Sequence, residues 1–93
     1  MLSDIPKNLE RVSKENLDKE ILRAGMIAEL DAVSLYEQMA AMTNDANLKI
    51  ILLDIAKEEK THIAEFETLL FRKDPQQIQE TEAGRKEVEE KTR

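Results

Sequence analysis

Apolar residues recur every three or four positions along two long stretches of the chain, a spacing that places them on one face of an α-helix. In the first stretch this stripe consists of Leu22, Met26, Val33, Tyr36 and Ala40, with Glu29 in its middle. In the second it consists of Leu48, Leu52, Ile55, Ile63, Phe66 and Leu70, with Glu59 in its middle and His62 at its edge. The pattern predicts two amphipathic helices, each with a carboxylate in its apolar face.

Capping residues and polar breaks set the bounds of these helices. Ser13 or Asn16 can cap the first helix, and its first turn is acidic. Thr43 or Asn44 can cap the second helix. Because the connection is short, we expect the two helices to form an antiparallel hairpin. The predicted elements are a loose arm at 1–12 and helices at 13–42, 45–72 and 75–92.

The third predicted helix differs in character from the other two. Asp74 suits its N-cap and Pro75 its first position, where a missing N–H is harmless. Its only sizeable apolar residues are Ile78 and Val88. Two readings stay open: a solvated or partly frayed tail, and a docking arm for a neighbouring subunit. The predicted fold is all-α, an antiparallel two-helix hairpin plus a short C-terminal helix in one domain over 1–93.

A second apolar sector on the first helix bears on assembly. It is interrupted by Asp31 and consists of Ile21, Ala24, Ile27, Ala28, Leu35, Met39 and Met42. A surface helix needs only one such sector. Two explanations of the second sector stay open. Either the third helix or the N-terminal arm covers it, or it is an interface with another subunit in an oligomer larger than a dimer.

Composition limits the classes of function that the chain can have. A chain of 93 residues has little room for a self-sufficient core. Its net charge of −6 argues against nucleic acid and favours cations. With no bilayer-spanning apolar stretch and no secretory signal pattern, we expect a cytoplasmic protein. Because the chain has no Cys, any metal must be held by carboxylate and imidazole groups.

The carboxylates in the apolar stripes are the candidate chemistry. A buried carboxylate must be protonated, paired or bound to a cation, and neither stripe contains Lys or Arg. Glu59 and His62, three residues apart, project from one face about 5 to 6 Å apart and can grip one ion. Glu29 is then the third candidate ligand. The alternative is a mutual hydrogen bond between Glu59 and His62, or a shallow helix that leaves both in water.

Other polar residues are weaker candidates. Tyr36 can hydrogen-bond a ligand carboxylate, or can serve in the core. Asp31, Glu58 and Glu65 lie off the central stripes and can attract incoming cations, but ordinary charged helix surfaces look the same.

The donor set is half of a known arrangement. In ferritin-like di-metal proteins, two helices each give a Glu and two others each give a Glu-x-x-His pair. This chain has one of each, so two copies supply four Glu and two His, whose four negative charges match two divalent ions. We therefore expect dimerisation into a four-helix bundle to be coupled to metal binding.

Two segments of the chain resemble the encapsulated ferritins, within the ferritin-like and rubrerythrin superfamily. They are the stretch MIAELDAVSLYEQ at residues 26–38 and the stretch EEKTH at residues 58–62. The resemblance implies that Glu29, Glu59 and His62 are ligands of a di-iron ferroxidase centre. It also implies a homodimer, an annular decamer of five dimers, and a place inside an encapsulin shell that stores the oxidised iron. Zinc, calcium or manganese can stand in for iron in such a site.

Some positions depart from the family pattern. Some relatives have an additional acid where Ala28 stands, near the site where metal ions enter, so Asp31 is the remaining candidate there. Some carry Trp in place of Leu35. The sequence ends at 89–93 without the small, apolar tail that usually docks cargo onto a shell, so truncation, a fusion and absence of encapsulation stay open. The competing functions are a non-catalytic metal-binding assembly module and a rubrerythrin-like peroxidase.

Overall fold

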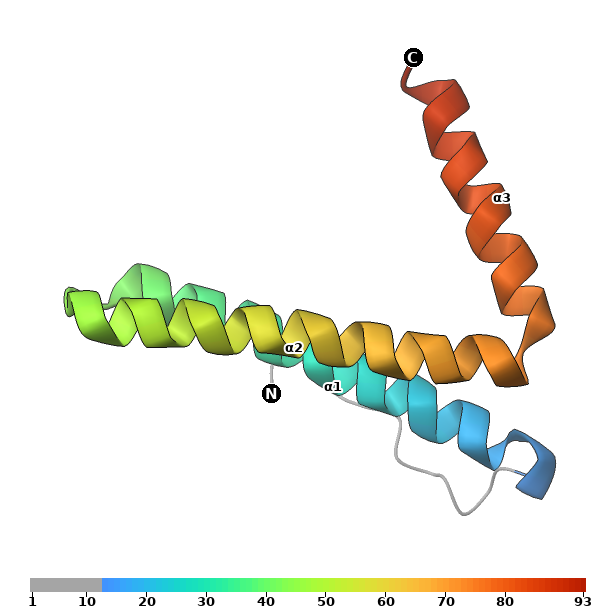
Figure 1. The fold of residues 1–93 in the computed structure, drawn as a ribbon, viewed down its shortest axis with the longest axis horizontal. Coiled ribbons are helices and arrows are strands. Elements are labelled where there is room, and N and C mark those ends of the chain that lie inside the picture. Colours follow the sequence, from blue (N-terminus) through green and yellow to red (C-terminus); the bar gives the residue numbers. More distant parts are fainter. Residues whose placement is uncertain (1–12) are drawn as a thin grey trace.

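The fold consists of two long antiparallel helices and a shorter third helix that projects away from them. A computed structural model describes residues 13–93, and the predicted loose arm at 1–12 lies outside the described residues. The helices are α1 (Lys14–Met42), α2 (Ala46–Lys73) and α3 (Pro75–Lys91). In Figure 1, α1 and α2 run side by side and α3 leaves the end of α2 steeply. Residues 13–93 contain no strand, which confirms the all-α prediction.

The turn between α1 and α2 is capped by a different residue from the two predicted. Asp45, rather than Thr43 or Asn44, is the N-cap of α2. Its Oδ1 accepts hydrogen bonds from the backbone N–H groups of Asn47 (2.9 Å) and Leu48 (3.0 Å). A carboxylate is well suited to this position because its charge also interacts with the positive end of the helix dipole. Thr43 instead accepts a hydrogen bond from the Asp45 N–H at 3.1 Å.

Asp74 forms the junction between α2 and α3, as its predicted capping role requires. Its Oδ1 accepts a hydrogen bond from the Gln77 N–H at 3.2 Å, and Pro75 is in the first turn of α3. Its Oδ2 accepts a hydrogen bond from Arg23 of α1 at 3.0 Å, and Arg23 also pairs with Glu20 at 2.7 Å. The start of α3 is therefore tied to both helices of the hairpin.

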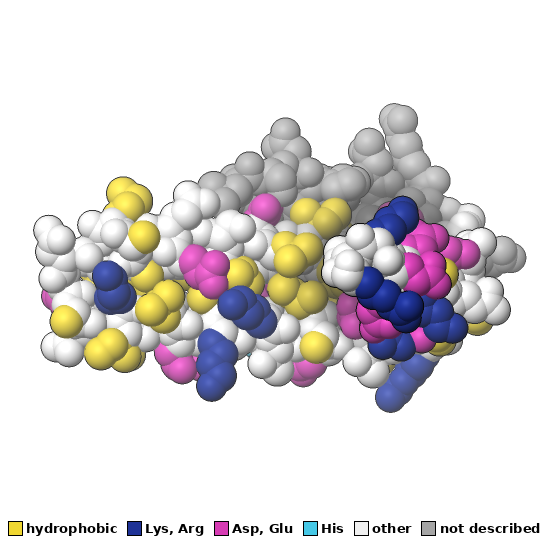
Figure 2. Space-filling model, turned by 90° about the horizontal axis from the view of Figure 1, so that it is seen from above, with side chains coloured by type: hydrophobic (Ala, Val, Ile, Leu, Met, Phe, Trp, Pro, Cys, Tyr) yellow, Lys and Arg dark blue, Asp and Glu magenta, His cyan; other side chains and the backbone are white. Residues whose placement is uncertain are grey.

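The core of the single chain is small. The buried apolar side chains, all between α1 and α2 or near their ends, are Leu22, Ala40, Leu52, Ala56 and Leu70. Many large apolar side chains of the hairpin are exposed instead, including Ile21, Leu35, Met39, Met42, Ile50, Ile51, Leu53 and Leu69. Figure 2 shows apolar side chains spread over the visible face of the hairpin. Within the described residues, the hairpin leaves much of its apolar surface uncovered.

Charged side chains dominate α3, which has no buried residue. Ile78 and Val88 are 48% and 61% exposed. Arg85 pairs with Glu82 and Glu89, and the hydrogen bond from Arg85 lowers the pKa of the Glu82 carboxyl. Ion pairs on one helix face support the helix itself. None of the helices in residues 13–93 has the length and apolar character needed to cross a membrane.

Candidate metal centre

The hairpin brings three potential metal ligands together between α1 and α2. Glu29 comes from the middle of α1, and Glu59 and His62 lie one turn apart on α2. One ligand atom from each side chain lies within 4.8 Å of the others. His62 Nδ1 is 3.2 Å from Glu59 Oε2 and 3.4 Å from Glu29 Oε2. Antiparallel packing thus brings ligands from two separate stretches of the sequence to one point.

One ligand atom is left without a hydrogen bond. Glu29 Oε2 is buried and accepts no hydrogen bond from the described residues, although His62 Nδ1 lies 3.4 Å from it. The Glu29 and Glu59 side chains are only 21% and 18% exposed, whereas His62 is 45% exposed. An unsatisfied carboxylate oxygen in such a place is costly unless a cation or a proton neutralises it.

The simpler reading of Glu59 and His62 is also present in the structure. His62 Nδ1 and Glu59 Oε2 lie within hydrogen-bond distance, at 3.2 Å. This contact accounts for two of the three side chains. It does not account for Glu29, whose buried Oε2 lies 3.4 Å from the same imidazole nitrogen. A mutual hydrogen bond is therefore an incomplete explanation of the three side chains.

The donor set fits a divalent metal ion of the first transition row. Two ligand atoms bound to one ion at about 2.1 Å lie about 3 Å apart when their bonds are at right angles. The distances from His62 Nδ1 to both carboxylates, 3.2 and 3.4 Å, are close to this value. Carboxylate with imidazole suits iron, manganese and zinc, and with Glu29 Oε2 unsatisfied the residues fit such an ion.

The other residues singled out in the sequence lie around this centre without completing it. Tyr36 is partly buried on α1, but within residues 13–93 its hydroxyl makes no hydrogen bond to the three ligands. Asp31 is partly buried and has a partner of its own. Glu58 is exposed, and Glu65 lines a shallow hollow beside Glu29 and His62.

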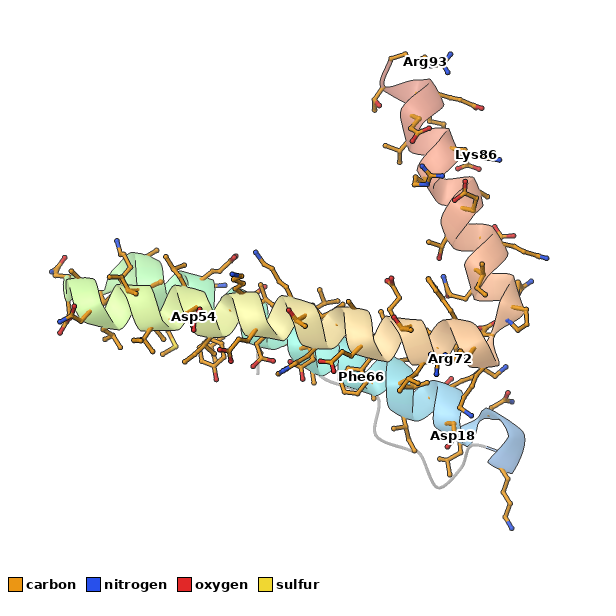
Figure 3. All side chains as sticks on the ribbon, viewed as in Figure 1. Asp18, Asp54, Phe66, Arg72, Lys86 and Arg93 are labelled. Atoms are coloured by element: carbon orange, nitrogen blue, oxygen red, sulfur yellow. The ribbon has the colours of Figure 1, made fainter. Side chains whose placement is uncertain are left out.

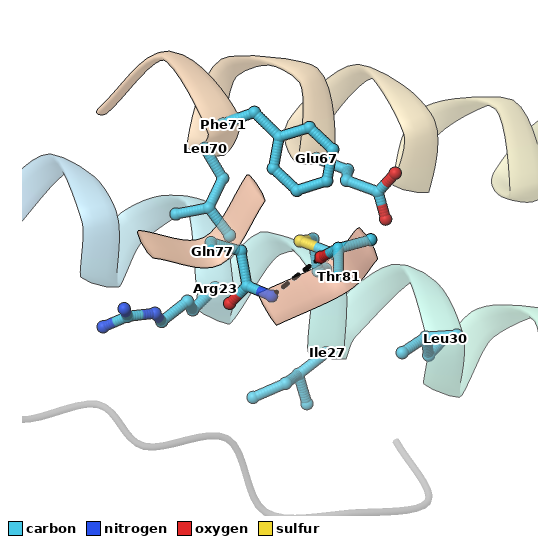
Figure 4. Close-up of a pocket in the computed structure, with 9 residues that line it drawn as sticks. Arg23, Ile27, Leu30, Glu67, Leu70, Phe71, Gln77 and Thr81 are labelled. Atoms are coloured by element: carbon cyan, nitrogen blue, oxygen red, sulfur yellow. Dashed lines mark hydrogen bonds between the residues drawn. The ribbon is translucent and has the colours of Figure 1, made fainter. Parts of the chain in front are cut away.

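A wider hollow lies elsewhere, where α1, α2 and the start of α3 meet (Figure 4). Its walls are mostly apolar, from Met26, Ile27, Leu30, Leu70 and Phe71. Among the described residues, the only carboxylate in its lining is Glu67, so they do not give this hollow the donors that a metal ion requires. Among residues 13–93, the side chains that could hold a metal ion therefore lie beside the smaller hollow that Glu29 and His62 line.

Comparison with known proteins places these features in a family. The family model described as EncFtn-like matches residues 4–83. The chain is also similar to a solved structure, the crystal structure of the encapsulated ferritin domain from Pyrococcus furiosus, with 47% identity and a TM-score of 0.82. That match covers 97% of this chain and 94% of the other.

Two curated relatives are longer than this chain. It is 50% identical, over 99% of its length, to the ferritin-like-encapsulin shell fusion protein of Pyrococcus furiosus. It is 36% identical, over 88% of its length, to the encapsulin nanocompartment cargo protein EncC of Myxococcus xanthus. The matched regions make up 27% and 62% of these two proteins.

Proposed function

The chain belongs to the EncFtn-like family, in agreement with its resemblance to encapsulated ferritins, and on that premise we propose that it is a ferroxidase. It oxidises Fe(II) to Fe(III) with dioxygen. The reaction takes place at a two-iron site to which two copies of the chain each contribute Glu29, Glu59 and His62.

The observation that carries this proposal is the convergence of the three ligands around a buried, unsatisfied oxygen. Glu29 Oε2 lacks a hydrogen bond among the described residues, and it lies 3.4 Å from an imidazole nitrogen that can also bind metal. Glu29 and His62 line a shallow hollow at the surface rather than a closed cavity. An open hollow of this kind gives ions access and leaves one side of the site for further ligands.

A second copy is the partner that this half-site requires. One chain offers two carboxylates, which neutralise one divalent ion; two copies offer four, which neutralise two. The hairpin also exposes large apolar side chains on either side of the site, such as Leu53 and Leu69, that a second hairpin would cover. Dimerisation therefore completes both the ligand set and the core, giving a four-helix bundle.

The residues have separate roles in the reaction. Iron is the substrate: two Fe(II) ions each give one electron to dioxygen, which takes up two protons to become hydrogen peroxide. Glu29 and Glu59, as anions, stabilise the increased charge of Fe(III) relative to Fe(II). His62 supplies a neutral nitrogen ligand, and its exposed side leaves a path for substrate. Tyr36 and Asp31 remain candidates for support and for ion uptake.

We also propose that the oxidised iron is stored within an encapsulin shell. Two relatives support this: one is named as a fusion to an encapsulin shell protein, and one as an encapsulin cargo protein. The annular decamer implied by the family resemblance stays a prediction. A cytoplasmic nanocompartment is the expected location.

Iron loading without oxygen, followed by air, tests the activity. The full chain is titrated anaerobically with Fe(II) and then mixed with air-saturated buffer, while Fe(III) absorbance and dissolved oxygen are recorded. We expect two ions per dimer and oxidation much faster than that of Fe(II) in buffer alone. Binding without accelerated oxidation would identify a structural metal site and contradict the ferroxidase proposal.

A further inference from the structure

Gly25 and Phe66 make an unusually close contact between the two helices of the hairpin. A Cβ atom built at Gly25 would lie 3.1 to 3.2 Å from three atoms of the Phe66 ring, Cε1, Cε2 and Cζ. Few Cβ atoms in proteins lie so close to an atom of another residue. The ring lies where α2 runs beside α1 (Figure 3). The absence of a side chain at position 25 is what allows the ring to rest on the backbone of α1.

This contact is adjacent to the metal ligands on both helices. Gly25 is one helical turn before Glu29 on α1, and Phe66 is one turn after His62 on α2. Phe66 also lines the shallow hollow that contains Glu29 and His62. Glu59 and His62 share a helix, so their spacing is set locally. The 3.4 Å separation of Glu29 Oε2 and His62 Nδ1 spans two helices and depends on how closely they pack here.

The second glycine of the chain shows that this contact is specific. Gly84 lies within α3, and a Cβ built there would meet nothing within 4 Å. Glycine is less favourable than alanine in the interior of any helix. At Gly25 that disadvantage has a packing reason, whereas at Gly84 the described residues provide none.

From this geometry we infer that Gly25 is a positioning residue for the metal site: by seating the Phe66 ring, it sets the distance between Glu29 and His62. Adding a methyl group at position 25 displaces the ring by a few tenths of an ångström, either into the ligand hollow or by separating the helices. Both movements change the position of Glu29 relative to His62. The inference rests on the proposed metal-binding function and adds to it the residue pair that aligns the ligands.

Co(II) binding to the full chain tests this role without relying on activity. Dissociation constants are measured from the Co(II) absorption bands for wild type, Gly25→Ala, Phe66→Leu and the double variant, with Gly84→Ala as the matched control. We expect Gly25→Ala and Phe66→Leu each to weaken binding about tenfold, the order of effect seen when residues that orient metal ligands are lost. The double variant should be within about twofold of Phe66→Leu, because leucine lacks the ring atoms that the new methyl meets. Gly84→Ala should bind as wild type does.

The outcomes separate this inference from the proposed function. Binding by Gly25→Ala within about twofold of wild type overturns the inference. It is also overturned if Gly25→Ala weakens binding by the same factor in the wild-type chain and in the Phe66→Leu variant. If Gly25→Ala loses its helical circular dichroism, Phe66→Leu alone decides: about tenfold weaker binding supports the inference, and binding within about twofold overturns it. A wild-type chain that does not bind Co(II), or a Glu29→Gln variant that binds it equally well, would remove the metal-site proposal and this inference together.

Discussion

We expect iron-dependent oxygen consumption to fall by about a hundredfold or more in each of three ligand variants, Glu29→Gln, Glu59→Gln and His62→Ala. The two glutamine variants preserve the shape of the side chain while removing its charge. Each therefore leaves a two-iron site with fewer anionic ligands, and in a dimer every substitution occurs twice. His62→Ala removes the nitrogen that lies 3.4 Å from Glu29 Oε2 and 3.2 Å from Glu59 Oε2. Oxygen uptake is measured with an electrode after anaerobic addition of Fe(II).

Glu80→Gln is the matched control for these variants. Glu80 is an exposed carboxylate of α3, outside the hairpin, and it undergoes the same chemical change. Its oxygen uptake should equal that of the wild type. If all three ligand variants consumed oxygen at the wild-type rate, the assignment of the site would be wrong. If Glu80→Gln lost activity equally, the losses would reflect general charge rather than ligation.

Leu52→Ala is expected to lower the free energy of unfolding by about 3 kcal/mol, the typical cost of truncating a buried leucine. Leu52 is 6% exposed and is one of five buried apolar side chains in the described residues, so its truncation removes a large part of a small core. The next residue, Leu53, is 47% exposed and provides a matched control, with an expected loss below about 1 kcal/mol in the metal-free chain. Urea unfolding of both variants at equal concentration measures the difference. Equal losses would mean that the core does not lie where the single chain places it.

The sequence pattern was sufficient for the architecture because it is local. The stripes predict the burial of Leu22, Ala40, Leu52 and Leu70, and the structure confirms it. Asp74 lies at the N-cap of α3 because the Asp-Pro pair can serve both the cap and the first helical position. Each of these features depends on neighbours within one or two helical turns.

Features that depend on how the two helices pack against each other could not be predicted from the local sequence pattern. Ala56 is 2% exposed although it lies outside the predicted stripe, so the buried face of α2 is wider than the stripe. Leu48 lies in the predicted stripe but is 48% exposed, since it is in the first turn of α2 beside the end of α1. Gly25 attracts attention only as a helix-interior glycine, and its contact with Phe66 requires the rotation of both helices to be known.

The candidate site also has one part that the local sequence predicts and one part that depends on helix packing. Sequence spacing places Glu59 and His62 on one face of α2, but nothing local brings Glu29 to the same level of the hairpin. That depends on the axial alignment of the helices, which the turn at Asp45 and the packing around Leu52 and Phe66 establish. The pairing of two chains is harder still to predict, since a single chain contains only half of the proposed ligands.

The sharing of the site between two chains is the central claim, and native mass spectrometry of the metal-free chain titrated with Fe(II) under nitrogen tests it most directly. We predict that dimers carry two iron ions, that the dimer fraction rises with added metal, and that Glu59→Ala and a chelator each abolish the rise. Iron bound to single chains, with a dimer fraction that neither metal, chelator nor Glu59→Ala changes, would contradict the claim.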